Sequence, residues 1–253
     1  MNLTRRSAFT LVELLVVIGI IGLLAGVSIP AIRGMTKSHA TVTADRQLLD
    51  DISFARAKAI SGHTTVYMVF VPPSVVNIIN TTDRGIGKQL TNLYGGQYTM
   101  YALLALRSVG EQPGVSTPHY LTQWRTMPNG TFIATNKYAL YDPTVTNGAR
   151  AFTTNSFPFP FSTNVLTKVM LPCIGFNYLG QLVSGQDEYL PIAHGSIFYG
   201  RDPTGAFAAQ PADVAELPAG NTIYSPNYPN NNYNQIHIEW LTGRAHVEKL
   251  EVQ

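Results

Sequence analysis

The sequence predicts an α+β fold in which one long N-terminal helix precedes an antiparallel β-rich globular domain. An apolar run covers residues 9–29, an amphipathic pattern continues to Gly62, and short β-branched or aromatic segments follow. Of the 253 residues, 45% are apolar and only 13% are charged, so a core is available. We expect three parts: residues 1–8, residues 9–29, and a domain over residues 30–253.

The first helical segment, from Phe9 to Ile29, is long enough to span a membrane. At 1.5 Å per residue it would extend roughly 31 Å, about the thickness of the hydrocarbon core of a bilayer. Arg5 and Arg6 precede it, and positively charged flanks remain on the cytoplasmic side. We therefore expect a single-pass topology with a cytoplasmic N-terminus and with everything after Pro30 across the membrane.

Glu13 is the acidic residue within this run, and it separates three interpretations. An ordinary secretory signal would be shorter and cut after small residues, for which Gly26-Val27-Ser28 is a weak candidate. A simple membrane anchor has no use for a carboxylate, which is costly in lipid and usually has a specific partner. If the leader is cut between Ala8 and Phe9, the new α-amino group can pair with Glu13 of a neighbouring chain.

The stretch Arg5-Arg6-Ser7-Ala8-Phe9-Thr10-Leu11-Val12-Glu13 and the apolar run resemble the prepilin signal of type IV pilins and type II secretion pseudopilins. The resemblance implies a pilin-like fold, removal of the leader by a prepilin peptidase, and methylation of Phe9. It also implies assembly through Glu13 with other pilin or pseudopilin subunits and an inner-membrane assembly platform. Membrane lipid would surround the helix before assembly, and the periplasmic domain would later join a periplasmic or extracellular filament.

Pro30 predicts a kink or a local opening of the helix, because proline lacks a backbone donor and clashes with the preceding turn. Its alternative role is to end the membrane span. The resemblance implies that the helix opens near this residue on assembly. Gly22 and Gly26 form a Gly-x-x-x-Gly spacing that allows close helix packing in lipid.

After Pro30 the pattern becomes that of an amphipathic helix, which we expect to end at Gly62. We expect its apolar face to pack on a sheet and not to form a separate binding groove, with the charged residues largely elsewhere. The apolar face contains Leu48, Ile52, Ala55 and Ala59, and the charged residues are Asp50, Asp51, Arg56 and Lys58.

The rest of the chain predicts one antiparallel sheet system. The β-branched or aromatic segments are Thr64–Val71, Tyr98–Arg107, Thr131–Thr135, Ile174–Tyr178, Ser196–Tyr199 and Gln235–Trp240. Tyr141–Phe161 reads as a long irregular insertion, and Ser225–Asn234 reads as a polar loop.

Three segments resemble the GspH/FimT-type minor pseudopilins. The first is the pattern Ala55-Arg56-x-x-Ala59-Ile60 that runs into the first strand. The second is the turn at Gln123–Gly130, and the third is Ile236–Arg244, with a closing strand and a Thr-Gly-Arg turn.

No motif predicts an enzyme, a cofactor or a metal site. The six histidines lack the H-E-x-x-H pattern or other close ligand spacing, and the lone Cys173 has no motif that places it beside a base. Asp187-Glu188 could contribute to a calcium site, but a solvated acidic turn is the simpler interpretation. We expect Cys173 to be a small buried apolar side chain.

The function expected is that of a minor pseudopilin in a type II secretion pseudopilus. The alternative is a minor type IV pilin in DNA uptake or surface adhesion, for which Arg244 is the candidate nucleic-acid contact. The net charge of +2 equals the contribution of Arg5 and Arg6, so no polyanion-binding surface is indicated. We therefore expect no nucleic-acid partner.

Overall fold

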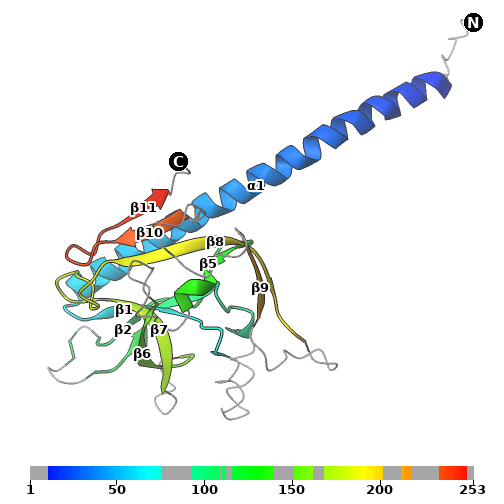
Figure 1. The fold of residues 1–253 in the computed structure, drawn as a ribbon. Coiled ribbons are helices and arrows are strands. Elements are labelled where there is room, and N and C mark those ends of the chain that lie inside the picture. Colours follow the sequence, from blue (N-terminus) through cyan, green and yellow to red (C-terminus); the bar gives the residue numbers. More distant parts are fainter. Residues whose placement is uncertain are drawn as a thin grey trace, which may run out of the picture. The chain divides into compact units, whose positions relative to one another are not determined.

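The computed structural model describes residues 11–75, 93–108, 110–111, 116–138, 151–161, 168–201, 212–217 and 234–249. The chain divides into two compact units, residues 1–39 and residues 40–253. Helix α1, Leu11–Ser61, begins in the first unit and ends in the second (Figure 1). Within α1, the side chains of residues 11–24 and 40–61 are described.

Helix α1 ends where the sequence predicts. The Gly62 amide donates to the Lys58 carbonyl at 2.9 Å, which completes the last helical turn. His63 then adopts a φ of 45°, so this histidine and not Gly62 takes the left-handed conformation that reverses the chain. The Thr64 amide closes the turn on the Ala59 carbonyl at 3.2 Å, and the first strand follows.

Within the described residues, the first sheet has six strands, and all its pairings are antiparallel. Its order is β3-β2-β1-β7-β6, with β4 also paired to β2. In the register, Met68 of β1 lies opposite Leu103 of β2 and Ile174 of β7. The strands are β1 Val66–Phe70, β2 Met100–Ala105, β3 His119–Tyr120, β4 Arg125–Thr126, β6 Thr153–Pro158 and β7 Lys168–Phe176.

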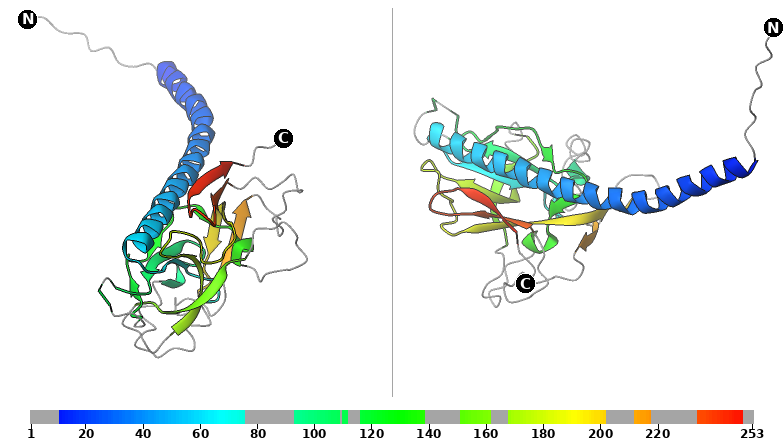
Figure 2. Two further views of the ribbon diagram at one scale, coloured as in Figure 1. Left: turned by 90° about the vertical axis from the view of Figure 1, so that its left-hand side faces the viewer. Right: turned by 90° about the horizontal axis from the view of Figure 1, so that it is seen from above.

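In the part of the chain that the structure describes, the second sheet has five strands, again antiparallel, in the order β11-β10-β8-β5, with β9 paired to β8. Figure 2 shows β10 and β11, coloured orange to red, side by side in this sheet. The 3-10 helix η1, Thr135–Tyr138, follows β5. The strands are β5 Thr131–Ile133, β8 Glu188–Phe198, β9 Asp213–Leu217, β10 Asn234–Ile238 and β11 Ala245–Lys249.

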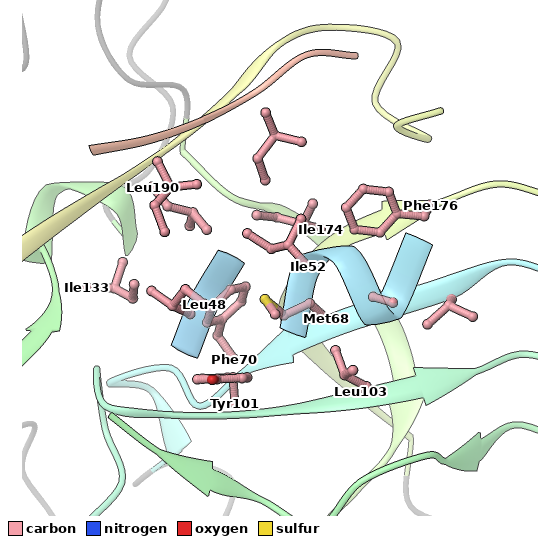
Figure 3. Packing of buried hydrophobic residues seen from close by; sticks show 14 of the residues in the cluster. Leu48, Ile52, Met68, Phe70, Tyr101, Leu103, Ile133, Ile174, Phe176 and Leu190 are labelled. Carbon is pink, nitrogen blue, oxygen red and sulfur yellow. The ribbon is translucent and has the colours of Figure 1, made fainter. Parts of the chain in front are cut away.

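The main core lies between the end of α1 and both sheets. Leu48 and Ile52 of α1 are fully buried beside Met68 and Phe70 of β1 (Figure 3). The expected helical face is therefore confirmed. The other fully buried residues of this face are Ala44, Ala55 and Ala59.

A second core covers the opposite face of the six-stranded sheet. Tyr67 and Val69, which alternate with the core-facing residues of β1, pack there with Phe157, Leu171 and Cys173. Because β1 is buried on both faces, it reads in the sequence as a continuous apolar run. Cys173 is a buried free cysteine, as expected.

Three expectations need correction. The strands form two sheets, because the end of α1 packs between them and each sheet covers part of its apolar face. The insertion at Tyr141–Phe161 is not wholly irregular: its described part contains β6, which pairs with β7 along its full length. Asp51 is buried, because Tyr101 and Arg125 supply polar partners at the edge of the apolar face.

In the loop predicted at Ser225–Asn234, only Asn234 is described, and it begins β10.

Candidate assembly surface

The described side chains of residues 11–24 are all exposed, and most of them are large and apolar. Their exposure ranges from 44% at Val17 to 79% at Leu11. Such a helix has no polar face to present to water, unlike the amphipathic segment that follows it. The large apolar residues are Leu11, Val12, Leu14, Leu15, Val16, Val17, Ile18, Ile20, Ile21, Leu23 and Leu24. We call residues 11–24 the apolar helix surface.

Two glycines lie within this surface. Apart from the adjoining helix backbone and the two chain neighbours, no heavy atom of the described residues comes within 4 Å of the position that a Cβ atom would take at Gly19 or Gly22. The helix backbone is therefore accessible at these two positions. Small residues of this kind allow a second helix to approach closely.

Glu13 is an exposed acidic side chain in the first turn of α1. A negative charge is favourable there, because the unpaired amides of a helix N-terminus carry partial positive charge. Ala8 and Phe9, where we predict cleavage, lie outside the described residues. Pro30 lies inside α1, and the kink expected there stays a prediction.

Residues 3–29 match the family model of the prokaryotic N-terminal methylation motif. The chain carries a prepilin-type N-terminal signal. The signal indicates a pilin-like or pseudopilin-like structural subunit that is processed at its N-terminus. Comparison with curated proteins finds no significant match, and neither does comparison with solved structures. A search of the described residues for a membrane-spanning helix finds none.

Downstream of the signal, Arg56 joins the helix to the closing turn of the second sheet. Its Nε donates to the Thr242 carbonyl at 2.7 Å. Gly243 has a φ of 62°, and a Cβ there would collide with the Gly180 carbonyl oxygen. Ala55 and Ala59 on either side of Arg56 are fully buried. The Ala-Arg-x-x-Ala pattern and the Thr-Gly-Arg turn are thus two halves of one structural contact, which sequence spacing alone could not reveal.

Arg244 is the last residue of this Thr-Gly-Arg turn, and its side chain is exposed. Its backbone amide donates to the Thr242 hydroxyl at 3.1 Å, and that hydroxyl donates to the Glu239 carboxylate at 2.8 Å. Because the side chain is exposed, the guanidinium is accessible to a ligand. The acidic side chain of Glu239 belongs to the same turn.

The acidic pair Asp187-Glu188 is divided between two environments. Glu188 is buried and accepts a 2.8 Å hydrogen bond from Lys137 Nζ, so its carboxylate is committed to an internal ion pair. Asp187 Oδ1 accepts the Trp240 amide at 2.8 Å. The two carboxylates therefore do not form the solvated acidic turn that the sequence suggested.

Proposed function

We propose that this chain is a minor subunit of a type II secretion pseudopilus, of the GspH/FimT type. It would be cut before Phe9 by a prepilin peptidase, methylated there, and assembled through its N-terminal helix. The observation that carries the proposal is the exposed apolar helix surface, which lies within the matched prepilin signal. A helix that is apolar on all sides needs lipid or other apolar helices around it.

The size of the hydrophobic term explains why such a helix must stay out of water, in lipid or in a filament core. Complete burial of one Leu, Ile or Val side chain contributes about 1.5–3 kcal/mol. Removing a few side chains of the apolar helix surface from water, into lipid or among other apolar helices, therefore supplies several kcal/mol, but transfer from lipid into a filament adds no such term. This contribution has no direction, so it cannot by itself set the register between neighbouring helices.

Glu13 can set the register between neighbouring helices, which the apolar contacts cannot set. A carboxylate in the middle of a bilayer costs up to about 2.5–3.5 kcal/mol, and less near the interface. The α-amino group created at Phe9 is a cation at the edge of the same kind of helix. Pairing this group with Glu13 of the next subunit would remove the cost and fix the axial offset between subunits.

The contact between Arg56 and the Thr242 carbonyl supports the subgroup assignment, because it joins two of the segments that resemble GspH/FimT-type minor pseudopilins. In this proposal the second unit is a periplasmic domain with its own core, and the helix anchors it in the inner membrane until it enters the filament. The other partners would be neighbouring pseudopilins and the assembly platform.

Processing is tested first, by intact-mass measurement of the chain produced together with a prepilin peptidase. We expect a mature chain that begins at N-methylated Phe9. A peptidase-inactive strain provides the control and should yield the full chain. An uncut chain in the presence of active enzyme, or a chain that begins near Ile29, would overturn the proposal.

Assembly is tested with Glu13→Leu and Glu13→Asp, measured by cross-linking to partner pseudopilins. The leucine variant should enter the membrane fraction as well as the original chain does, yet fail to co-assemble. The aspartate variant keeps the charge and should retain part of the cross-linking. Normal incorporation of Glu13→Leu would show that the carboxylate has no assembly role.

A DNA-binding minor type IV pilin is the alternative, and the exposed side chain of Arg244 is the feature that favours it. Non-specific DNA binders have dissociation constants of about 10⁻⁴–10⁻⁶ M at physiological salt, through clustered phosphate contacts. We expect no retardation of duplex DNA by micromolar protein at that salt concentration. A salt-sensitive shift that Arg244→Ala removes would favour DNA uptake instead.

A further inference from the structure

Several side chains with metal-binding chemistry meet on one face of the five-stranded sheet. His237 of β10 lies directly opposite His246 of β11 and, on its other side, opposite Tyr189 of β8. Glu248 follows His246 by two positions, and residues two apart on a strand share a face. Asp187 immediately precedes β8.

This face is the one that points away from the main core. Ile236 and Ile238, which flank His237 on β10, are fully buried in that core. The side chain of His237 therefore points to the opposite face, where it is 15% exposed. His246 is 51% exposed and Glu248 34%, so an ion in solution can reach the three side chains.

The two imidazole rings converge on a single carboxylate oxygen. Glu248 Oε1 lies 2.8 Å from His237 Nδ1 and 3.4 Å from His246 Nε2. Gln235 Nε2 donates to the other oxygen, Oε2, at 2.8 Å, which directs Oε1 toward the rings. One ligand atom from each of His237, His246 and Glu248 lies within 4.8 Å of the other two.

We propose that His237, His246 and Glu248 bind a divalent transition-metal ion of the zinc class. Two imidazole nitrogens and one carboxylate oxygen are ligands that zinc accepts in proteins. With bonds of 2.0–2.1 Å, tetrahedral ligand atoms lie roughly 3.4 Å apart. The separations here are close enough that small side-chain rotations would place the three atoms at three tetrahedral positions, with water in the fourth. Calcium is not the expected ion, because it takes oxygen ligands.

The surroundings of His237 place a carboxylate beside its second ring nitrogen, where metal-binding histidines usually have a partner. When one ring nitrogen binds a metal, the other usually donates its proton to a carboxylate or a carbonyl, which fixes the ring. His237 Nε2 lies 3.3 Å from Asp187 Oδ2, an ion-pair distance without hydrogen-bond alignment. Asp187 is held in turn by the Trp240 amide. The Tyr189 ring stacks on His237, with centroids 4.5 Å apart and planes at 16°.

The cluster also has a simpler interpretation as hydrogen bonds and ion pairs between strands. In that case Glu248 would serve only as an acceptor for the two histidines. The two interpretations differ in one measurable property, since only a metal site binds one equivalent of ion through all three side chains. The histidine spacing along the chain could not show this site, because the pairing of β10 with β11 brings His237 and His246 together.

The test is a titration of the full chain, purified in detergent and freed of metal with a chelator, first with Co²⁺ and then with Zn²⁺. We expect the visible absorption of protein-bound Co²⁺ to saturate at one equivalent per chain. Zn²⁺ should then remove that absorption and raise the Tm. Absence of the absorption at saturating Co²⁺ would overturn the proposal without any variant.

Variants locate the ion. His246→Asn and Glu248→Gln change exposed or half-exposed side chains. Each should lower the affinity for Co²⁺ and Zn²⁺ by more than about tenfold. Asp187→Asn, which alters the partner of His237, should lower that affinity about 10–100-fold. His194→Asn on β8 is the matched control and should leave affinity unchanged. Circular dichroism of each metal-free variant checks the fold. Binding that survives His246→Asn and Glu248→Gln, or that His194→Asn removes, would place the metal elsewhere and refute the site.

Discussion

The phenolic hydroxyl of Tyr101 donates a 2.7 Å hydrogen bond to Asp51 Oδ2 and thereby joins β2 to α1. Gln47 Nε2 donates to the same hydroxyl at 2.9 Å, and the Arg125 guanidinium pairs with Asp51 Oδ1. Burial and the hydrogen bond to Asp51 raise the pKa of Tyr101 well above its usual range. The phenol therefore stays protonated, and the buried carboxylate keeps its donor.

Tyr101→Phe should lower the free energy of unfolding by about 1.5–3 kcal/mol, because a hydrogen bond to a charged buried group is lost while the ring is kept. Urea unfolding followed by circular dichroism measures this change. Tyr178→Phe is the control, since Tyr178 is 56% exposed in a turn. Equal stability of the two variants would contradict a structural role for the contact between Tyr101 and Asp51.

Gly243→Ala should destabilise the protein more than Gly185→Ala does. Both glycines have positive φ, 62° and 67°, so each substitution carries a backbone cost of about 1–2 kcal/mol. At Gly185 no heavy atom of the described residues beyond the two chain neighbours lies within 4 Å of the new Cβ, whereas at Gly243 the Cβ meets the Gly180 carbonyl oxygen. Thermal unfolding of the two variants isolates the effect of close packing, and identical Tm values would argue against it.

Glu188→Gln should cost about 3–5 kcal/mol, because it leaves the fully buried Lys137 without its negative partner. The Lys137 ammonium also lies 5.1 Å from the centroid of the Phe152 ring, which offers only part of the lost attraction. The double variant Lys137→Met with Glu188→Leu should be more stable than Glu188→Gln, as measured by urea unfolding. The opposite order would show that the attraction within the ion pair, and not the loss of one of its two partners, decides the cost.

Cys173 should resist thiol reagents in the native chain. Burial, the largest cause, and the negative charge of Glu188 raise the pKa of the thiol to about 12, although a hydrogen bond with Thr153 acts in the opposite direction. At pH 8 the reactive thiolate is therefore scarce, whereas a free cysteine with a pKa of about 8.5 ionises readily. Labelling with a chromogenic disulfide should be slow before urea is added and fast afterwards. Equal rates would mean that the strand pair of β1 and β7 opens easily.

The limits of prediction from sequence are visible at Leu48 and Asp51. Leu48 lies on the buried face that the helical period predicts. Asp51 is buried as well, although an acidic side chain is usually expected to be exposed. Its burial depends on Tyr101 and Arg125, which are 50 and 74 positions away in the chain. A periodic pattern contains no information about such distant polar partners.

The strands show the same division. The apolar run at β1 predicts a buried strand, because the run itself records burial on both faces. In β6 the first four residues are exposed, so the segment has no apolar run, and only its pairing with β7 makes it a strand. The sequence pattern likewise did not predict the separation into two sheets, since this separation depends on where α1 packs.

By itself, the sequence determined the features that are local in the chain: the prepilin-type signal at residues 3–29, the carboxylate at Glu13, and the change from an apolar to an amphipathic helix. Only the tertiary structure decided that Arg56 meets the Thr242 carbonyl and that His237 meets His246 and Glu248. The physical reason is that period and composition reflect the environment of each residue along its own segment. Contacts between distant residues depend on strand register and on the packing of α1, which are set by the whole fold at once.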